Sequence, residues 1–309
     1  MNDSPIKITS RMLLFFLSYF YSFSKIINKN MSLLALRKAL STFSKTNAAP
    51  AVELFRQLTP ADLGYYVSDD AAMEYMQSPQ SFPILSHGFK LGTALRQELL
   101  RPGEEHHSPM IWMNSQRDRI GCSTLYEDEQ VTLCWFVVPP RHTLGLHDHP
   151  TMTVWQRVLF GRLQVTAMDF EGPPPTVSEI QHCKDAFPGV VRHTGEVSSE
   201  NSGLLHFTPE SGGGVLHELT NPHDTEPALF IDIIAPPYYR EKDDLPCTYY
   251  IAEKRTEENE KNGKKEKEFN LSNVDSGLVE PLVVGDKVRL VPRRNYGGPA
   301  LQAFVHLQD

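Results

Sequence analysis

The feature that most constrains this chain is a succession of short apolar runs between about residues 110 and 236. The runs are rich in β-branched and aromatic residues, turn residues separate them, and no useful helical periodicity lies between them. Many short strands at regular spacing are typical of a sandwich, barrel or jelly roll, so we expect an all-β chain. The eight runs are IWMNSQ, STLYED, VTLCWFVVP, TVWQRVLFG, RLQVTAMDF, LLHFTPE, GVLHELT and ALFIDIIAP.

Charge and cysteine usage exclude several classes of protein. The 309 residues include 30 Lys and Arg against 38 Asp and Glu, and the formal charge of -8 argues against nucleic acid as the main partner. No Cys-x-x-Cys pair occurs, so neither a zinc ribbon nor a thioredoxin-like motif is present. We interpret the four cysteines as free thiols in a reducing compartment: Cys122, Cys134, Cys183 and Cys247.

The N-terminal segment differs from the rest, because no acidic residue lies between Asp3 and Glu53 while seven basic ones do. Such a start resembles a targeting segment. The apolar stretch 12–23 is too short to predict a membrane span, but it could be the hydrophobic part of a secretory signal. Alternatively Met31 is the functional start of a basic amphipathic helix, with an apolar face formed by Leu33, Leu34, Leu36, Leu40 and Phe43. These alternatives predict a mitochondrial protein if the segment is cleaved on import, and a cytoplasmic one if Met31 is the start.

The remaining composition shifts suggest the organisation of the chain. Residues 49–63 read as short helices, with Pro60 at a first helical position, and 282–291 as a final hairpin turning at Gly285 and Asp286. We divide the chain into a basic segment (1–48), a helical and irregular extension (49–109), a core (110–253) with an inserted loop (171–203), a charged linker (254–270), and C-terminal strands that pack on the core (271–309).

A pair of histidines gives the first indication of chemistry. His147 and His149 are two residues apart, and on a strand such residues point to the same face. Two adjacent imidazoles can chelate iron, zinc, copper or nickel. His-x-His alone is common by chance, so the pair needs support from its context.

That support comes from the two cupin motifs, G-x5-H-x-H-x3-4-E-x6-G and G-x5-P-x-G-x2-H-x3-N. The matching positions are His147, His149, Gly161, Gly214, His217 and Asn221, and the departures are Arg141, Val154 and Gly212. Val154 stands where the motif has a glutamate ligand. Three neutral histidines without a carboxylate leave a divalent ion with its full charge and open positions, which suits an anionic thiolate together with dioxygen.

Several further blocks resemble one family. HDHPTMTVWQRVLFG, GVLHELTN, ALFIDIIAPPYY and PCTYY are similar to segments of the 2-aminoethanethiol dioxygenases and plant cysteine oxidases. The resemblance covers about residues 110–252, and extends weakly to the N-terminal helices and to Tyr296-Gly-Gly-Pro. It implies a cupin double-stranded β-helix (jelly roll) with short N-terminal helices. It also implies a non-haem Fe(II) enzyme that adds both atoms of O2 to a thiol and gives a sulfinate.

The resemblance also implies the metal ligands. These are His147, His149 and His217, and His206 is the main rival for the third position. His206 lies eleven residues before His217, outside the spacing of the second motif.

Other residues acquire expected roles in the same way. Asp232 and Tyr238 match family positions, and we expect Asp232 to orient a ligand or the substrate; the alternative is that it caps a turn. Cys247 and Tyr249 resemble a pair that crosslinks in some animal members, but we favour the interpretation of Cys247 as an ordinary buried cysteine. Thr151 departs from the glycine that the family has after His-Asp-His-Pro.

These implications lead to a functional hypothesis. The substrate is cysteamine, whose sulfinate is hypotaurine, or a peptide with an N-terminal cysteine; both carry a thiol two carbons from a primary amine. The alternatives are another three-histidine metallo-cupin, such as a zinc hydrolase or isomerase, and a non-enzymatic cupin that binds a ligand. We expect a monomer without a membrane span and without nucleic acid as a partner.

Overall fold

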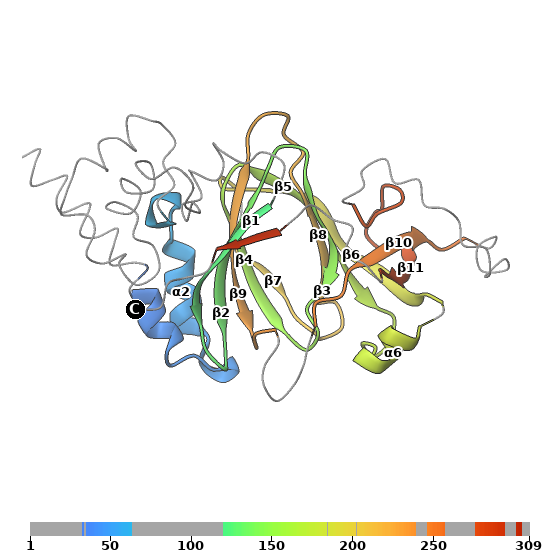
Figure 1. The fold of residues 1–309 in the computed structure, drawn as a ribbon, viewed down its shortest axis with the longest axis horizontal. Helices are drawn as coiled ribbons and strands as arrows, with labels where there is room; N and C mark the ends of the chain where they lie inside the picture. The colour runs from blue at the N-terminus through green and yellow to red at the C-terminus, as the bar shows by residue number, and fades with distance from the viewer. Residues whose placement is uncertain are drawn as a thin grey trace, which may run out of the picture.

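The computed structural model describes residues 33, 35–63, 120–183, 185–201, 203–238, 246–256, 276–293 and 301–304. Within these ranges twelve strands form two six-stranded sheets that face one another (Figure 1). The two sheets enclose one apolar interior, to which both contribute side chains. The expected all-β cupin architecture with short N-terminal helices is confirmed.

The first sheet has the strand order β12-β1-β2-β9-β4-β7. Neighbouring strands in it are antiparallel, except that β1 and β12 are parallel. Its strands are β1 (Ile120–Glu127), β2 (Thr132–Val138), β4 (Thr153–Phe160), β7 (Leu205–Phe207), β9 (Ala228–Ala235) and β12 (Leu301–Phe304).

The second sheet has the order β10-β11-β6-β5-β8-β3, with antiparallel neighbours throughout. Its strands are β3 (Thr143–Asp148), β5 (Arg162–Phe170), β6 (Phe187–Ser198), β8 (Leu216–Thr220), β10 (Tyr250–Lys254) and β11 (Lys287–Pro292).

The strand β9 is buried on both faces, which explains its continuous apolar sequence. Phe230 and Ile234 point into the space between the sheets. Ile231 and Ile233 point outward, where the N-terminal helices cover them. A strand with both faces buried needs apolar residues at nearly every position, and in β9 the one exception is Asp232.

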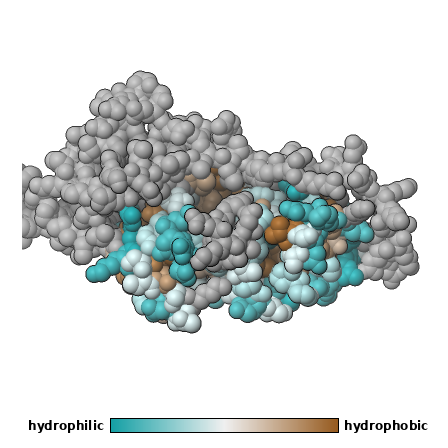
Figure 2. All heavy atoms as spheres, turned by 60° about the horizontal axis from the view of Figure 1, so that its bottom comes forward, coloured by the Kyte–Doolittle hydropathy of each residue, from teal (hydrophilic) through white to brown (hydrophobic). Residues whose placement is uncertain are grey.

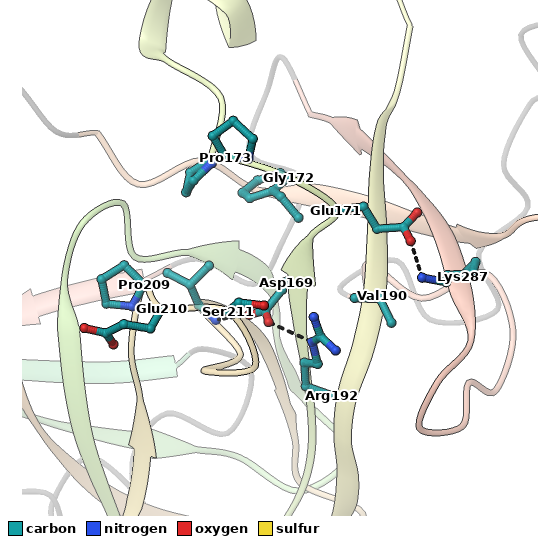
Figure 3. Close-up of a pocket in the computed structure, with 13 residues that line it drawn as sticks. Asp169, Glu171, Gly172, Pro173, Val190, Arg192, Pro209, Glu210, Ser211 and Lys287 are labelled. Carbon is teal, nitrogen blue, oxygen red and sulfur yellow. Dashed lines mark hydrogen bonds and ion pairs between the residues drawn. The ribbon is translucent and has the colours of Figure 1, made fainter.

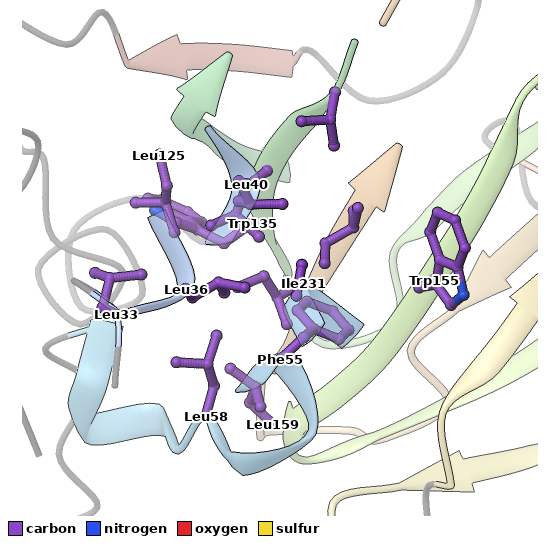
Figure 4. Close-up of a cluster of buried hydrophobic side chains, with 14 of the residues drawn as sticks. Leu33, Leu36, Leu40, Phe55, Leu58, Leu125, Trp135, Trp155, Leu159 and Ile231 are labelled. Atoms are coloured by element: carbon purple, nitrogen blue, oxygen red, sulfur yellow. The ribbon is translucent and has the colours of Figure 1, made fainter. Parts of the chain in front are cut away.

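The N-terminal helices pack on the outer face of the first sheet. They comprise a helical segment at 35–40, η1 (Lys45–Asn47), α2 (Ala49–Gln57) and η2 (Pro60–Leu63). Part of the segment predicted as 1–48 therefore belongs to the folded unit, from Leu33 onward. The buried cluster at this contact includes Leu33, Leu36, Leu40, Phe43, Phe55, Leu58, Trp135, Trp155 and Ile231 (Figure 4).

Arg157 fastens α2 to the barrel. Its Nη1 donates hydrogen bonds to the carbonyl oxygens of Phe55 (3.3 Å), Leu58 (2.7 Å) and Arg56 at the end of the helix. Phe55 O also accepts a hydrogen bond from the backbone N–H of Leu58 (3.3 Å), and the positive charge of Arg157 suits this end of the helix dipole.

Replacing Arg157 with methionine is therefore expected to lower the free energy of unfolding by about 2 kcal/mol, because the helix carbonyls lose a charged donor. Urea denaturation measures the change. Arg162→Met is the control, since Arg162 is half-exposed and forms only a 3.6 Å ion pair with Glu196. Equal changes in the two variants would contradict a fastening role for Arg157.

The segment 171–203 is not simply an inserted loop, so this prediction is wrong in part. It contains the short helix α6 (Val177–His182) and the twelve-residue strand β6, which lies between β11 and β5. The stretch Gly-Pro-Pro-Pro at 172–175 and the polar sequence after it made the segment resemble a loop. Gly189 is there for packing, because a Cβ atom at this position would lie 2.6 Å from Leu290 Cδ1.

The predicted hairpin at 282–291 is also wrong. Its second half forms β11, but β11 pairs with β10 and β6, not with residues 282–284. Leu282 is buried in the core beneath β10 and β11, while Gly285 adopts a positive φ of 91° in the turn that precedes β11. Leu282 is thus held by packing, while Val283 and Val284 are exposed and the Val283 N–H donates to Asp286 Oδ2 (2.9 Å).

Some predictions fall outside the described residues. They concern the run at 111–116, residues 1–32, most of the charged linker and Tyr296-Gly-Gly-Pro. In the described part, no helix has the length and apolar character needed to cross a membrane. The coloured atoms in Figure 2 are mainly hydrophilic, with smaller apolar areas among them, and the large apolar side chains exposed in the described ranges are Val279, Val283 and Val284.

Candidate metal centre

The three predicted ligands come together inside the barrel. His147 on β3 and His217 on β8 are direct cross-strand partners, and Ala167 on β5 is the next residue in the same row. His149 follows the end of β3, where its backbone N–H donates to Val215 O. β3 was absent from the eight apolar runs, because its sequence, TLGLHD, is short and partly polar.

The three imidazoles converge closely enough to share one ion. One nitrogen from each lies within 4.8 Å of the others, and His149 Nε2 is 3.0 Å from His217 Nε2. All three side chains are buried. Two imidazole nitrogens this close must share a proton or face a common cation, so the donor set fits a metal ion.

Hydrogen bonds at the opposite nitrogen orient two of the rings. His147 Nδ1 lies 2.8 Å from Gly145 O and donates to it. His149 Nδ1 donates to the Tyr238 hydroxyl (2.7 Å), which in turn donates to the carbonyl oxygen of Asp148 (2.6 Å). We assign these tautomers from the available acceptors, and they leave both Nε2 lone pairs for a metal.

Burial keeps the histidines neutral. It lowers the pKa of His147 from 6.5 to about 4, and a weaker opposing effect comes from the hydrogen bond to Gly145. The pKa values of His149 and His217 are held well below 6.5, first by burial and then by the neighbouring histidines. Neutral imidazole is the form that binds a metal, so the site needs no deprotonation near neutral pH.

Two carboxylates next to the ligands turn away from them. Asp148 accepts hydrogen bonds from Thr248 N (2.8 Å) and the Tyr250 hydroxyl (2.9 Å), which hold the start of β10. Glu218 accepts from Leu146 N (3.2 Å) and also holds the backbone near residue 277. Burial raises the pKa of each to about 7. Their alternation with the histidines along a strand could have indicated this supporting role.

Asp232 lies in the middle of β9 and points into the barrel, so the alternative that it caps a turn is wrong. Its direct cross-strand partners are Gln156 on β4 and Cys134 on β2. Burial raises the pKa of Asp232 from 3.8 to about 8, and the nearby Gln156 amide offsets part of the increase. Gln156 was not among the predicted site residues, because one glutamine in an apolar run carries no motif.

The rival ligand His206 lies elsewhere. It is exposed, and its ring stacks on Trp155 with a centroid distance of 5.3 Å, on the outer face of β4 and β7. Phe207, the residue after His206, points inward instead. The centroid of the Phe207 ring lies 4.6 Å from that of the His217 ring. Val154, at the position of the motif glutamate, is fully buried opposite Phe207 and supplies no carboxylate.

Other motif residues support the backbone. Gly161 has a φ of 72°, and a Cβ atom there would lie 2.6 Å from Pro227 O. Asn221 Nδ2 donates to Val138 O (3.0 Å) and to Glu226 O (2.8 Å), which fastens the loop after β8. These positions therefore explain the motif without taking part in chemistry.

Thr151 occupies a strained position in the turn after His149, with a φ of 61°. Replacing it with glycine is expected to raise the free energy of unfolding by about 1 kcal/mol, because a β-branched residue strongly disfavours this left-handed conformation. Thermal or urea unfolding measures the gain. Thr153→Gly, in the regular strand β4, should instead be destabilising. A loss of stability in Thr151→Gly would show that its side chain contributes more than the strain removes.

A surface cavity of about 450 Å3 lies apart from this centre, and none of the three histidines lines it (Figure 3). Four of its charged groups form two ion pairs: Arg192 with Asp169 at 2.7 Å, and Lys287 with Glu171. Asp169 also accepts hydrogen bonds from the backbone N–H groups of Gly212 and Gly214. These bonds support the turn before β8, so the cavity walls have a structural explanation.

The jelly roll and its three buried, converging histidines define a metallo-cupin. Comparison with known proteins then identifies the family: the PCO_ADO family model matches residues 54–301, and the chain belongs to this family.

The chain is similar in sequence to 2-aminoethanethiol dioxygenases and to plant cysteine oxidases. 2-Aminoethanethiol dioxygenase of Mus musculus is 30% identical over 172 residues, covering 52% of this chain and 61% of the relative. The protein of the same name from Homo sapiens is 29% identical, covering 52% and 58%. Plant cysteine oxidase 1 of Arabidopsis thaliana is 26% identical over 127 residues, covering 41% and 40%. The matched part thus spans about three fifths or less of these relatives.

Proposed function

We propose that this chain is an iron-dependent thiol dioxygenase. The reaction is R–SH + O2 → R–SO2H, in which both oxygen atoms join the sulfur and the product ionises to a sulfinate. The substrate is cysteamine or a peptide with an N-terminal cysteine. The observation that carries the proposal is a three-histidine centre without a carboxylate, in a family with relatives named for 2-aminoethanethiol and for cysteine.

His147, His149 and His217 would hold the iron. Bound Fe(II) supplies the means for triplet dioxygen to react with a thiolate. The neutral ligands keep the positive charge of the centre intact, which favours binding of the substrate as a thiolate.

The chain's own residues position the reactants. Tyr238 keeps the His149 ring in the tautomer that presents Nε2 inward, through its bonds to His149 and Asp148. Asp232 faces the same interior and offers a carboxyl group to the substrate amine. Phe207 and Val154 line the space beside His217 with apolar surface, which keeps water away from the reacting sulfur.

Oxygen uptake tests this function directly. Protein loaded with Fe(II) without air is mixed with oxygenated buffer and with cysteamine or a peptide bearing N-terminal Cys, and products are weighed by mass spectrometry. We expect uptake of O2 and a product heavier by two oxygen atoms. No uptake with either thiol at full iron occupancy would overturn the proposal, and oxygen-independent turnover by zinc-loaded protein would favour the hydrolase or isomerase alternative.

We also propose a monomer in the cytoplasm, with the mitochondrion as the alternative. None of the four cysteines forms a disulfide, which suits a reducing compartment. Cell fractionation tests the compartment, and sedimentation velocity tests the oligomeric state.

A further inference from the structure

The polar pair Gln156 and Asp232 is the least explained feature of the barrel interior. Gln156 is fully buried, and neither its Nε2 nor its Oε1 has a hydrogen-bond partner among the described residues. Asp232 faces it from β9, is 3% exposed, and has an equally unpartnered Oδ1. The Gln156 amide lies close enough to Asp232 to lower its pKa, yet Gln156 Nε2, Gln156 Oε1 and Asp232 Oδ1 are left without a hydrogen-bond partner among the described residues.

Such an arrangement is unfavourable unless something else binds there. A buried amide without partners loses its hydration and gains nothing in return. The flanking inward positions on β4 are Val154 and Val158, and the cross-strand partner on β7 is Leu205, none of which has a polar side chain. Fold stability alone would favour an apolar residue at 156.

The position of Gln156 relative to the metal centre suggests its ligand. Val154 and Phe207 are cross-strand partners, and the Phe207 ring contacts that of His217. Gln156 is the next inward residue after Val154, about 6.8 Å further along the strand. A small molecule held at the histidines by its sulfur can therefore reach Gln156 with atoms a few bonds away.

The chemistry of the pair selects among thiols. A carboxamide has a donor group and an acceptor, so it can bond to a peptide bond in either of two ways: its N–H donates to the peptide C=O, or its C=O accepts from the peptide N–H. The carboxyl group of Asp232 matches a primary ammonium. An N-terminal cysteine presents thiol, amine and first peptide bond in succession, whereas cysteamine has no peptide bond and free cysteine would bring a carboxylate towards Asp232.

We propose that Gln156 binds the first peptide bond of the substrate and so determines specificity for N-terminal cysteine over cysteamine. This inference rests on the proposed function and deepens it.

The test compares kcat/KM for a Cys-initiated peptide and for cysteamine in iron-loaded wild-type protein, Gln156→Leu and Gln164→Leu. Gln164 is the control, because it faces outward from β5 and its Nε2 already donates to Thr194 Oγ1. We expect Gln156→Leu to lower kcat/KM for the peptide by about 10- to 100-fold, with little change for cysteamine. Gln164→Leu should leave the ratio of the two substrates unchanged.

A second measurement does not depend on how a variant folds. A depsipeptide with an ester in place of the first peptide bond lacks the N–H that would donate to Gln156 Oε1, and its carbonyl is a weaker acceptor for Gln156 Nε2. Its affinity, measured by titration without oxygen, should be about 10-fold weaker than that of the peptide for wild-type protein. Gln156→Leu should bind the two equally.

Two results would overturn the inference while leaving the proposed function intact: equal losses for peptide and cysteamine in Gln156→Leu, or equal binding of peptide and depsipeptide by wild-type protein. Failure of wild-type protein to oxidise either thiol would overturn the proposed function as well.

Discussion

Replacing His217 with alanine is expected to abolish metal retention and to reduce thiol oxidation by roughly 1,000-fold or more, because the centre loses one of three nitrogen donors and has no carboxylate in reserve. The position on β8 admits no substitute, since its row neighbours on β3 and β5 are His147 and Ala167. Metal content by mass spectrometry and oxygen uptake measure the two losses. His147→Ala should behave in the same way.

The matched control is His206→Ala, which removes an imidazole eleven residues away that stacks on Trp155 outside the barrel. It should retain metal and activity at near wild-type levels. Retained metal in His217→Ala, or its loss in His206→Ala, would refute the assignment of the third ligand.

The histidine centre was predictable because its evidence is local in sequence. His147 and His149 are two residues apart, and the second motif carries its own spacing around His217. The cross-strand pairing of His147 with His217 is long-range, but the jelly roll brings these two motifs together wherever it forms. Recognising the motifs therefore predicted the proximity.

The polar pair behind the centre could not be found in the same way. Gln156 and Asp232 are 76 positions apart and meet only through the register of β4 and β9. Neither residue belongs to a spacing pattern that links them. Asp232 was identified by family resemblance alone, and Gln156 was hidden in a run that is correctly predicted as a strand.

The N-terminal helices show the same division between local and non-local information. Four residues of the apolar face expected after Met31 are buried, namely Leu33, Leu36, Leu40 and Phe43, and the fifth, Leu34, lies outside the described residues. Their binding surface is the outer face of the first sheet, which no local pattern identifies. The errors at β6 and at residues 282–284 arise similarly, because distant partners such as Leu290 and the β10 strand determine what these segments do.

Replacing Asp232 with asparagine is expected to make the metal-free protein more stable near neutral pH while lowering its activity once iron is loaded. Burial raises the pKa of Asp232 from 3.8 to about 8, so the folded state holds a proton that the unfolded state releases above pH 4. Stability is therefore lost as pH rises from about 4 towards 8, at about 1.4 kcal/mol per pH unit. At pH 7 the difference is on the order of 4 kcal/mol, and asparagine avoids it because it does not ionise.

Urea denaturation of both metal-free proteins at pH 5, 6 and 7 tests the sign. The stability of Asp232→Asn relative to wild type should increase steadily over this range, and other titrating groups cancel in the difference. A flat difference would show that the carboxyl group ionises in the fold as readily as in the unfolded chain. A gain in stability joined to a loss of thiol oxidation would instead mean that the buried acid is kept for the substrate, at the expense of the fold.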